Sequence, residues 1–114
     1  MSRPRAKVRP AGRGRASVFA ALGDETRLTL IGRLSGGPPQ SISRLARGSR
    51  LTRQAITKHL RVLERAGVVH SVRVGREQQF AFRPATLKDA QDYLARVSDQ
   101  WDRVLLRLKA FVES

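Results

Sequence analysis

Hydrophobic residues in the first part of the chain recur at the three- and four-residue spacing of helices that pack on a core. A short helix is expected over residues 17–23, with an apolar face made of Val18, Phe19 and Leu22. A longer helix, DETRLTLIGRLS, begins after Asp24, a residue type that often caps helices, and the sequence GGPP ends it. Its expected buried positions are Leu28, Leu30, Ile31 and Leu34.

Two further helices are expected in close succession over residues 41–67. Ser41 is suited to cap the shorter one, SISRLARG, and Thr52 to cap the longer one over residues 52–66. Gly67 follows the longer helix, where glycine is common because it adopts a left-handed conformation without strain. The buried stripe of the longer helix consists of Ile56, Leu60 and Leu63. A helix, a short turn and a second helix are typical of a helix-turn-helix.

The pattern then changes to runs of β-branched and aromatic residues. VVHSVRV and QQFAF flank Gly75 and Arg76, and two such runs around a glycine-containing pair predict a tight hairpin over residues 68–83. Pro84 is expected to close the hairpin. A basic hairpin directly after a helix-turn-helix predicts a winged helix-turn-helix, which is a mainly α fold with a small β-hairpin.

From residue 86 to residue 112 the apolar residues alternate by three and four, a heptad spacing that continues through the whole helix. Such a helix rises roughly 40 Å at about 1.5 Å per residue, which is more than so small a domain covers by itself. We therefore expect a partner helix, most simply that of a second copy, and dimer packing is favoured over a ligand pocket for Trp101. The expected interface residues are Leu87, Leu94, Val97, Trp101, Val104, Leu108 and Phe111.

The charge of the chain is unevenly distributed. Its formal net charge of +14 arises from residues 1–16, with six Arg and Lys and no acid, and from residues 41–83, with ten Arg and Lys against two acids. Residues 17–40 and 84–114 each balance to zero. A basic excess confined in this way is typical of a protein that binds a polyanion. Nucleic acid is favoured over a membrane, because the basic helix lacks a wide apolar face.

The helix over residues 52–66 has a second face, on which every side chain can donate hydrogen bonds. In a winged helix-turn-helix this helix enters the major groove, and the hairpin reaches along the backbone. The expected base contacts are Arg53, Gln54, Thr57 and Lys58. The expected phosphate contacts are Arg44, Arg47, Arg50, Arg61, Arg73 and Arg76. A merely solvated face is the alternative, which the coincidence of face, fold order and charge disfavours.

The sequence resembles the ArsR-type family of small bacterial winged-helix repressors in three stretches, ALGDETRLTLIGRL, SISRLA and TRQAITKHLRVLERAGVVHSVRVGREQQFAF. The resemblance covers residues 18–83 closely and the last helix in kind, so residues 17–114 are expected to form one such domain. It implies a homodimer whose first and last helices form the interface. The implied activity is repression of transcription at an inverted-repeat operator, relieved by an inducer.

Three residues that match family signatures are expected to serve the fold. Thr26 and Arg27 are interpreted as helix-start and packing residues. His59 is interpreted as a partly buried histidine between the recognition helix and the core, in preference to a base contact.

The chain departs from the metal-sensing members of that family. Those members place cysteines in the third helix, or Asp, His and Glu clusters on the last helix. This chain has no Cys, its last helix has no His, and the acids of that helix are hard oxygen donors that do not select a transition metal. We expect no metal and no cofactor, as in the metal-free branch that the aromatic last helix resembles. The sequence identifies no inducer.

Residue types and segments that the sequence lacks bear on catalysis and on the location of the protein. Two isolated histidines and no cysteine leave nothing for nucleophilic or acid–base chemistry, so we expect no enzyme. The alternatives are a sequence-indifferent nucleoid or architectural DNA-binding protein and a winged helix that serves as a protein-interaction module. The lack of cysteine, of a signal peptide and of a long apolar run predicts a cytoplasmic protein. Residues 1–16 are expected to be a disordered basic arm, either lying along bound DNA or solvated.

Overall fold

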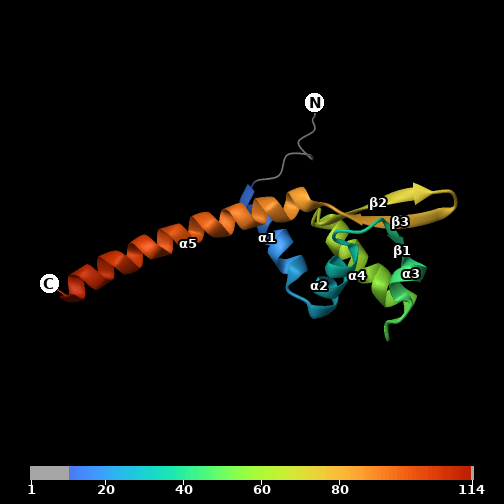
Figure 1. The fold of residues 1–114 in the computed structure, drawn as a ribbon, viewed down its shortest axis with the longest axis horizontal. Coiled ribbons are helices and arrows are strands. Elements are labelled where there is room, and N and C mark those ends of the chain that lie inside the picture. The colour runs from blue at the N-terminus through green and yellow to red at the C-terminus, as the bar shows by residue number, and fades with distance from the viewer. Residues whose placement is uncertain (1–10, 114) are drawn as a thin grey trace, which may run out of the picture.

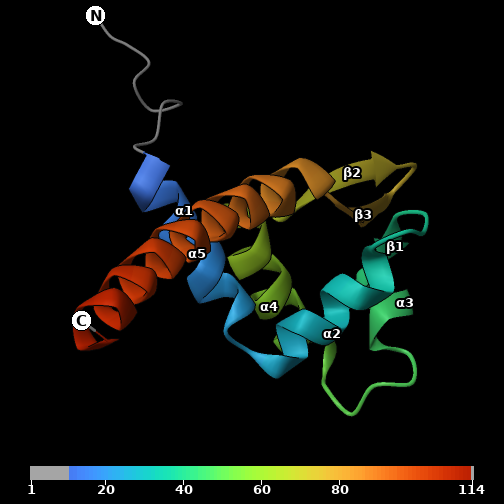
Figure 2. The ribbon, with the colours of Figure 1, turned by 60° about the vertical axis from the view of Figure 1, so that its left-hand side comes forward.

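The computed structural model describes residues 11–113 and shows a helical body, a small sheet at one end and a long last helix that leaves the body at the other end (Figures 1 and 2). The elements are, in order, α1 (Ala11–Leu22), α2 (Glu25–Leu34), β1 (Gln40–Ser41), α3 (Ile42–Ala46), α4 (Arg53–Arg65), β2 (Val69–Val74), β3 (Glu77–Phe82) and α5 (Pro84–Glu113). The expected mainly helical fold with a wing is confirmed. Residues 1–10 of the expected arm lie outside the described residues.

The three expected helix caps are confirmed. The Asp24 carboxylate accepts a hydrogen bond from a backbone N–H in the first turn of α2 at 3.0 Å. The hydroxyls of Ser41 and Thr52 do the same at the starts of α3 and α4, at 3.1 and 3.0 Å. Each bond satisfies an N–H group that the first turn of a helix leaves without an intrahelical partner. These caps fix where the two helices of the helix-turn-helix begin.

The core lies where α2, α3 and α4 meet the base of the sheet. Its most deeply buried large side chains are Leu34, Leu45, Ile56, Leu60, Leu63, Val68, Val69 and Phe80. The stripe expected in α4 is therefore confirmed. Leu28 was expected to be buried, and this is wrong, because 50% of its surface is exposed. The buried residues of α2 are Leu30, Ile31 and Leu34, and Leu28 lies at the edge of the face that they form.

The wing belongs to a three-stranded antiparallel sheet with the strand order β1-β3-β2. β2 and β3 pair along their full length, and Gly75, at φ +64°, lies in the expected two-residue turn. The strand β1 was not expected, because two residues are too few to show an alternating pattern. It pairs Gln40 with Phe80 of β3 and so attaches the start of α3 to the wing.

α1 includes residues 11–16, which were expected to be disordered, so that expectation is wrong. The guanidinium carbon of Arg15 lies 4.6 Å from the centroid of the Tyr93 ring in α5, and its Nε lies 3.7 Å from the Asp89 carboxylate. Phe19 packs against the same ring, with the centroids 6.2 Å apart. A cation–π contact and an aromatic pair therefore attach α1 to α5. Arg15 belongs to the fold and not to a free basic arm.

α5 begins at Pro84 and not at residue 86, because proline suits the first position of a helix, where its missing N–H would have no partner. The first turns of α5 lie on the body. Leu87 packs against the core and Ala90 is buried. The C-terminal half projects away from the body (Figure 1). Within residues 11–113, no helix is long and apolar enough to cross a membrane.

Candidate nucleic-acid interface

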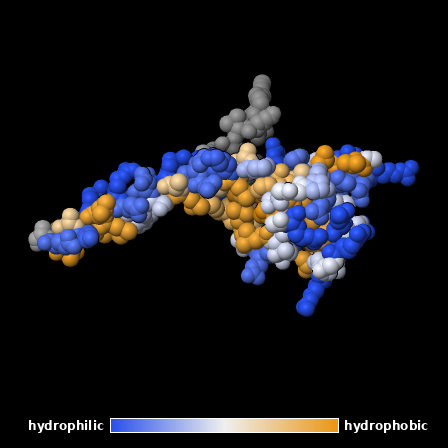
Figure 3. All heavy atoms as spheres, viewed as in Figure 1, coloured by the Kyte–Doolittle hydropathy of each residue, from blue (hydrophilic) through white to orange (hydrophobic). Residues whose placement is uncertain are grey.

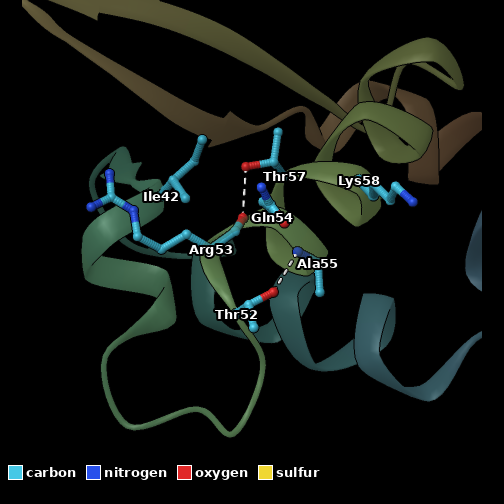
Figure 4. Close-up of a pocket in the computed structure, with 7 residues that line it drawn as sticks. All are labelled: Ile42, Thr52, Arg53, Gln54, Ala55, Thr57 and Lys58. Carbon is cyan, nitrogen blue, oxygen red and sulfur yellow. Dashed lines mark hydrogen bonds between the residues drawn. The ribbon is translucent and has the colours of Figure 1, made fainter.

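The outward face of α4 carries the four side chains that we expected to contact bases. The buried stripe of α4 fixes the opposite face in the core, so the orientation of the helix is set by packing. Arg53, Gln54 and Lys58 are exposed, and Thr57 is partly exposed. In Figure 4 the side chain of Arg53 extends over α3, whereas that of Lys58 extends on the opposite side of α4. The four residues therefore span the N-terminal half of the helix.

A shallow hollow of about 590 Å³ lies at this face (Figure 4). Its lining consists of Ile42, Thr52, Arg53, Gln54, Ala55, Thr57 and Lys58. The hydroxyl of Thr57 donates to the carbonyl oxygen of Arg53 at 2.7 Å. Because its proton is used in this way, Thr57 offers an external ligand a methyl group and an acceptor oxygen, but no donor.

A second hollow joins α4 to the wing. Its lining consists of Ser41, Ile42, Ser43, Arg53, Arg76, Glu77 and Gln78. Arg53 thus borders both hollows, and Arg76 of the wing turn faces the same space as the start of α3. Ser43 and Gln78 were not among the expected contacts, because nothing in the local sequence shows that the wing and α3 share a surface.

The basic residues of the segment 41–83 have no acidic partners within residues 11–113. The ion pairs within residues 11–113 all lie in α1 and α5. They join Arg15 to Asp89, Lys88 to Asp92 and Arg103 to Asp99. The two acids of the segment are bound to uncharged side chains: Glu64 accepts from the Ser71 hydroxyl and Glu77 from the Gln79 amide, both at 3.0 Å. The expected phosphate contacts, all exposed, are Arg44, Arg47, Arg50, Arg61, Arg73 and Arg76.

α2 holds the helix-turn-helix in place through an arginine that the sequence pattern did not single out. Nη1 and Nη2 of Arg33 donate to the carbonyl oxygens of Leu45 and Arg44 at 2.6 and 3.1 Å, in the last turn of α3. A cation is favourable there, because the last carbonyls of a helix lack intrahelical partners and carry the negative end of the helix dipole. Arg33 therefore fixes α3 relative to α2.

Arg27 makes comparable contacts at the start of α2. Its Nε donates to the carbonyl oxygen of Ala21 at 2.7 Å and its Nη2 to that of Ala20 at 3.4 Å, both in the last turn of α1. Its Nη1 lies 3.3 Å from Nδ1 of His59 in α4. Both side chains are partly buried. The interpretations of Arg27 as a packing residue and of His59 as a partly buried residue behind the recognition helix are confirmed.

The cap of α2 is ionised over an extended pH range. The backbone N–H of Arg27 donates to the Asp24 carboxylate and lowers its pKa below the ordinary value of 3.8. Burial acts in the opposite direction, and the positive charges of Arg27 and His59 lower the pKa further. Because the folded state favours the carboxylate, the cap stabilises α2 at neutral pH and loses this effect as pH falls through the lowered pKa.

Within residues 11–113, no three His, Cys, Asp or Glu side chains are grouped so that they could hold a metal ion.

The fold and the basic surface together define a winged helix-turn-helix, the class of DNA-binding protein in which the second helix of the motif reads the major groove. A family model described as a helix-turn-helix domain matches residues 22–72, a range that contains α2, α3 and α4.

Similar proteins are transcriptional regulators. The uncharacterized HTH-type transcriptional regulator YuzN of Bacillus subtilis is 38% identical over 79 residues, which cover 64% of this chain and 86% of that protein. The HTH-type transcriptional regulator Rv2034 of Mycobacterium tuberculosis is 31% identical over 97 residues, with coverages of 85% and 87%. A solved structure of an ArsR-like transcriptional regulator from Rhodococcus sp. RHA1 superposes on this chain with a TM-score of 0.80 and is 42% identical in sequence. The match covers 89% of this chain and 94% of the regulator's chain.

The chain belongs to the ArsR-type family of winged helix-turn-helix proteins and is a DNA-binding transcriptional regulator.

Proposed function

We propose that the protein is a homodimeric repressor in which α4 of each subunit enters the major groove at one half of an inverted-repeat operator. The observation that carries the proposal is the set of ten basic residues in the segment 41–83, none of which forms an ion pair within residues 11–113. A cationic surface without internal counter-ions gains most from an external polyanion, because binding releases the counter-ions condensed on DNA.

The residues of this surface have different roles. The base-reading residues are Arg53, Gln54, Thr57 and Lys58. The residues that hold phosphates are Arg44, Arg47, Arg50, Arg61, Arg73 and Arg76. Gln54 suits adenine, and Arg53 and Lys58 suit guanine. Thr57 uses its methyl group on thymine or accepts from a base, since its own proton is bound to the backbone. The hollow between α3 and the wing supports this division, because it lets a phosphate approach Arg76 beside the reading face.

The exposed apolar residues of α5 support a dimer. Leu94, Trp101 and Leu108 lie on the heptad seam and are 52%, 60% and 54% exposed. Apolar surface costs about 25 cal/mol per Å² in water, so covering these side chains with a second copy is strongly favourable. The proposed interface also contains Leu87, Val97, Val104 and Phe111. Leu87 contributes least, because it packs partly against the core of its own subunit.

Selection of duplexes from a random-sequence library with the full chain tests the proposal. We expect enrichment of two inverted half-sites about one helical turn apart, because a two-fold dimer presents its two recognition helices at that spacing. DNase footprinting should show both half-sites protected, and light scattering should give the mass of a dimer. The selected site, placed across a promoter, should lower transcription of a reporter gene.

Each of the other outcomes contradicts one part of the proposal or indicates a different function. A monomer at micromolar concentration contradicts the dimer. Uniform affinity for every duplex, without enrichment, indicates an architectural DNA-binding protein. Absence of duplex binding at physiological salt indicates a protein-interaction module. A rise in reporter transcription contradicts repression and leaves DNA reading intact.

A further inference from the structure

One side chain, Arg27, touches three helices at once. It belongs to α2, its Nε and Nη2 donate to carbonyl oxygens in the last turn of α1, and its Nη1 faces Nδ1 of His59 in α4 at 3.3 Å. α1 is in turn attached to α5 by the contacts of Arg15 and Phe19 with Tyr93. A continuous series of contacts therefore runs from the helix of the proposed dimer interface to the recognition helix.

The direction of the contact between Arg27 and His59 fixes the protonation state of the imidazole. A guanidinium has five N–H donors and no acceptor, so Nδ1 of His59 must accept. The ring is then neutral and carries its proton on Nε2. A protonated ring has no acceptor and adds a second positive charge at the same distance. The contact is therefore compatible with neutral His59 and not with its protonated form.

His59 does not read DNA itself. At about 100° per residue it lies roughly 140° around α4 from Gln54, and its side chain faces Arg27 at the start of α2. Any effect of His59 on DNA binding must therefore act through the position of α4. In a dimer this effect is amplified, because both recognition helices must match half-sites at a fixed spacing.

We infer that Arg27 and His59 are positioning residues for DNA reading: core packing sets which face of α4 points outward, the contact between the two side chains holds α4 against α2, and protonation of His59 releases that contact. This inference rests on the proposed dimeric mode of DNA reading. It predicts that affinity for a paired half-site falls on acidification, because a protonated ring has no acceptor for the Arg27 guanidinium. Affinity for unrelated duplexes falls less, since phosphate contacts tolerate a small shift of α4.

The charged groups near His59 act in opposite directions on a positive charge on its ring. The carboxylate of Asp24, the N-cap of α2, attracts a positive charge on the imidazole. The guanidinium of Arg27 in α2 repels a protonated ring, because its Nη1 lies 3.3 Å from Nδ1. α1 presents the carbonyl oxygens of Ala20 and Ala21, which are bound to Arg27. On protonation the ring is therefore repelled by the guanidinium and attracted toward Asp24, which breaks the contact.

Nitrogen-15 NMR of the histidine rings in the DNA-free full chain tests the contact directly. We expect His59 to show a protonated Nε2 and an unprotonated Nδ1 at pH 7.5. His70, exposed on β2, is the internal reference, and His70→Asn identifies its signal. The opposite tautomer of His59, or a charged ring at this pH, would overturn the inference without reference to DNA.

Binding as a function of pH tests the consequence, with a duplex selected by the full chain and a random duplex of equal length as probes. His59→Ala and Arg27→Gln should weaken binding to the selected duplex by about threefold to tenfold at pH 7.5, and the double variant no more than either single one, as expected for one shared contact. His59→Asn keeps an acceptor near the position of Nδ1 and cannot be protonated. It should restore affinity and bind independently of pH, while His70→Asn keeps the wild-type pH profile.

The outcomes separate the inference from the function on which it rests. Wild-type affinity and pH profile in His59→Ala would overturn the inference and leave the proposed function intact. The same pH profile in His59→Asn as in the wild type would also overturn it. Failure of the full chain to select any duplex would overturn both.

Discussion

The segment 41–83 leaves basic side chains without ion-pair partners, whereas the helix α5 leaves apolar side chains exposed to water. The segment buries most of its large apolar residues in the core, with Val74 as an exposed exception, and carries ten basic residues against two acids, without an ion pair inside residues 11–113. α5 pairs Lys88 with Asp92 and Arg103 with Asp99, and leaves a row of large apolar side chains exposed. Figure 3 shows the apolar row along one edge of the projecting helix and hydrophilic residues along the other.

This difference indicates two partners of different chemistry. Unpaired surface cations gain from a polyanion, and salt weakens that gain. Exposed apolar side chains gain from apolar cover, and salt does not weaken that gain. Dimerisation through α5 should therefore persist at salt concentrations that release DNA. The two surfaces are coupled, because a dimer places two copies of α4 on one DNA molecule.

The largest expected effect comes from a charge placed in the apolar row of α5. Leu94→Glu puts two like charges across the proposed seam, where burial of an unpaired carboxylate is unfavourable. We expect a monomer by light scattering. Loss of simultaneous binding to two half-sites should lower affinity for the selected duplex by at least about 100-fold.

The matched control is Ala110→Glu, which adds the same charge on the opposite, exposed side of α5. It should remain a dimer and bind normally. A dimeric Leu94→Glu, or a monomeric Ala110→Glu, would contradict the assignment of the seam.

A smaller effect distinguishes residues that contact bases from residues that contact phosphates within the segment 41–83. Gln54→Ala should cost roughly 1–3 kcal/mol on the selected duplex and relax base preference at one position, because it removes a base contact. Arg61 lies about two turns after Gln54 on the same face. Arg61→Ala should weaken the selected and the random duplex equally, because it removes a phosphate contact. Both proteins should remain dimers. Equal losses on both duplexes for Gln54→Ala would show that Gln54 does not read a base.

Features set by neighbouring residues were predictable, and features set by distant residues were not. The caps at Asp24, Ser41 and Thr52 and the wing turn at Gly75 each depend on a few adjacent residues, and the structure confirms them. Within the stretch 11–16, Arg15 contacts Tyr93, which lies far along the chain, and the composition of the stretch does not show this contact. The strand β1 likewise exists because β3 lies beside it.

The candidate site shows the same division. The outward face of α4 follows from helical periodicity, so its exposed residues were found from spacing alone. The hollow that brings Gln78 and Ser43 beside Arg53 depends on the packing of the wing against α3, which no local pattern encodes. The carbonyl contacts of Arg27 and Arg33 were missed for the same reason, since a charge count treats every arginine alike.

The smallest expected effect concerns the basic residues that precede the folded body. Residues 1–10 contain Arg3, Arg5, Lys7 and Arg9 and no acid. If they contact DNA once the body is bound, their deletion should flatten the slope of log K against log salt by about 0.9 for each lost contact and weaken selected and random duplexes together. Dimerisation and base preference should not change, because α5 and α4 determine them.

The deletion must end before α1, since removal of residues 1–16 also removes Arg15 and its contacts with Tyr93 and Asp89. Arg15→Gln in the full chain is the matched control, because it removes one positive charge from the body and leaves the preceding residues in place. It should lower thermal stability, by loosening α1 from α5, and keep the salt slope of the wild type. An unchanged slope after deletion of residues 1–10 would show that these residues do not contact DNA, and the segment 41–83 would remain the proposed DNA-binding surface.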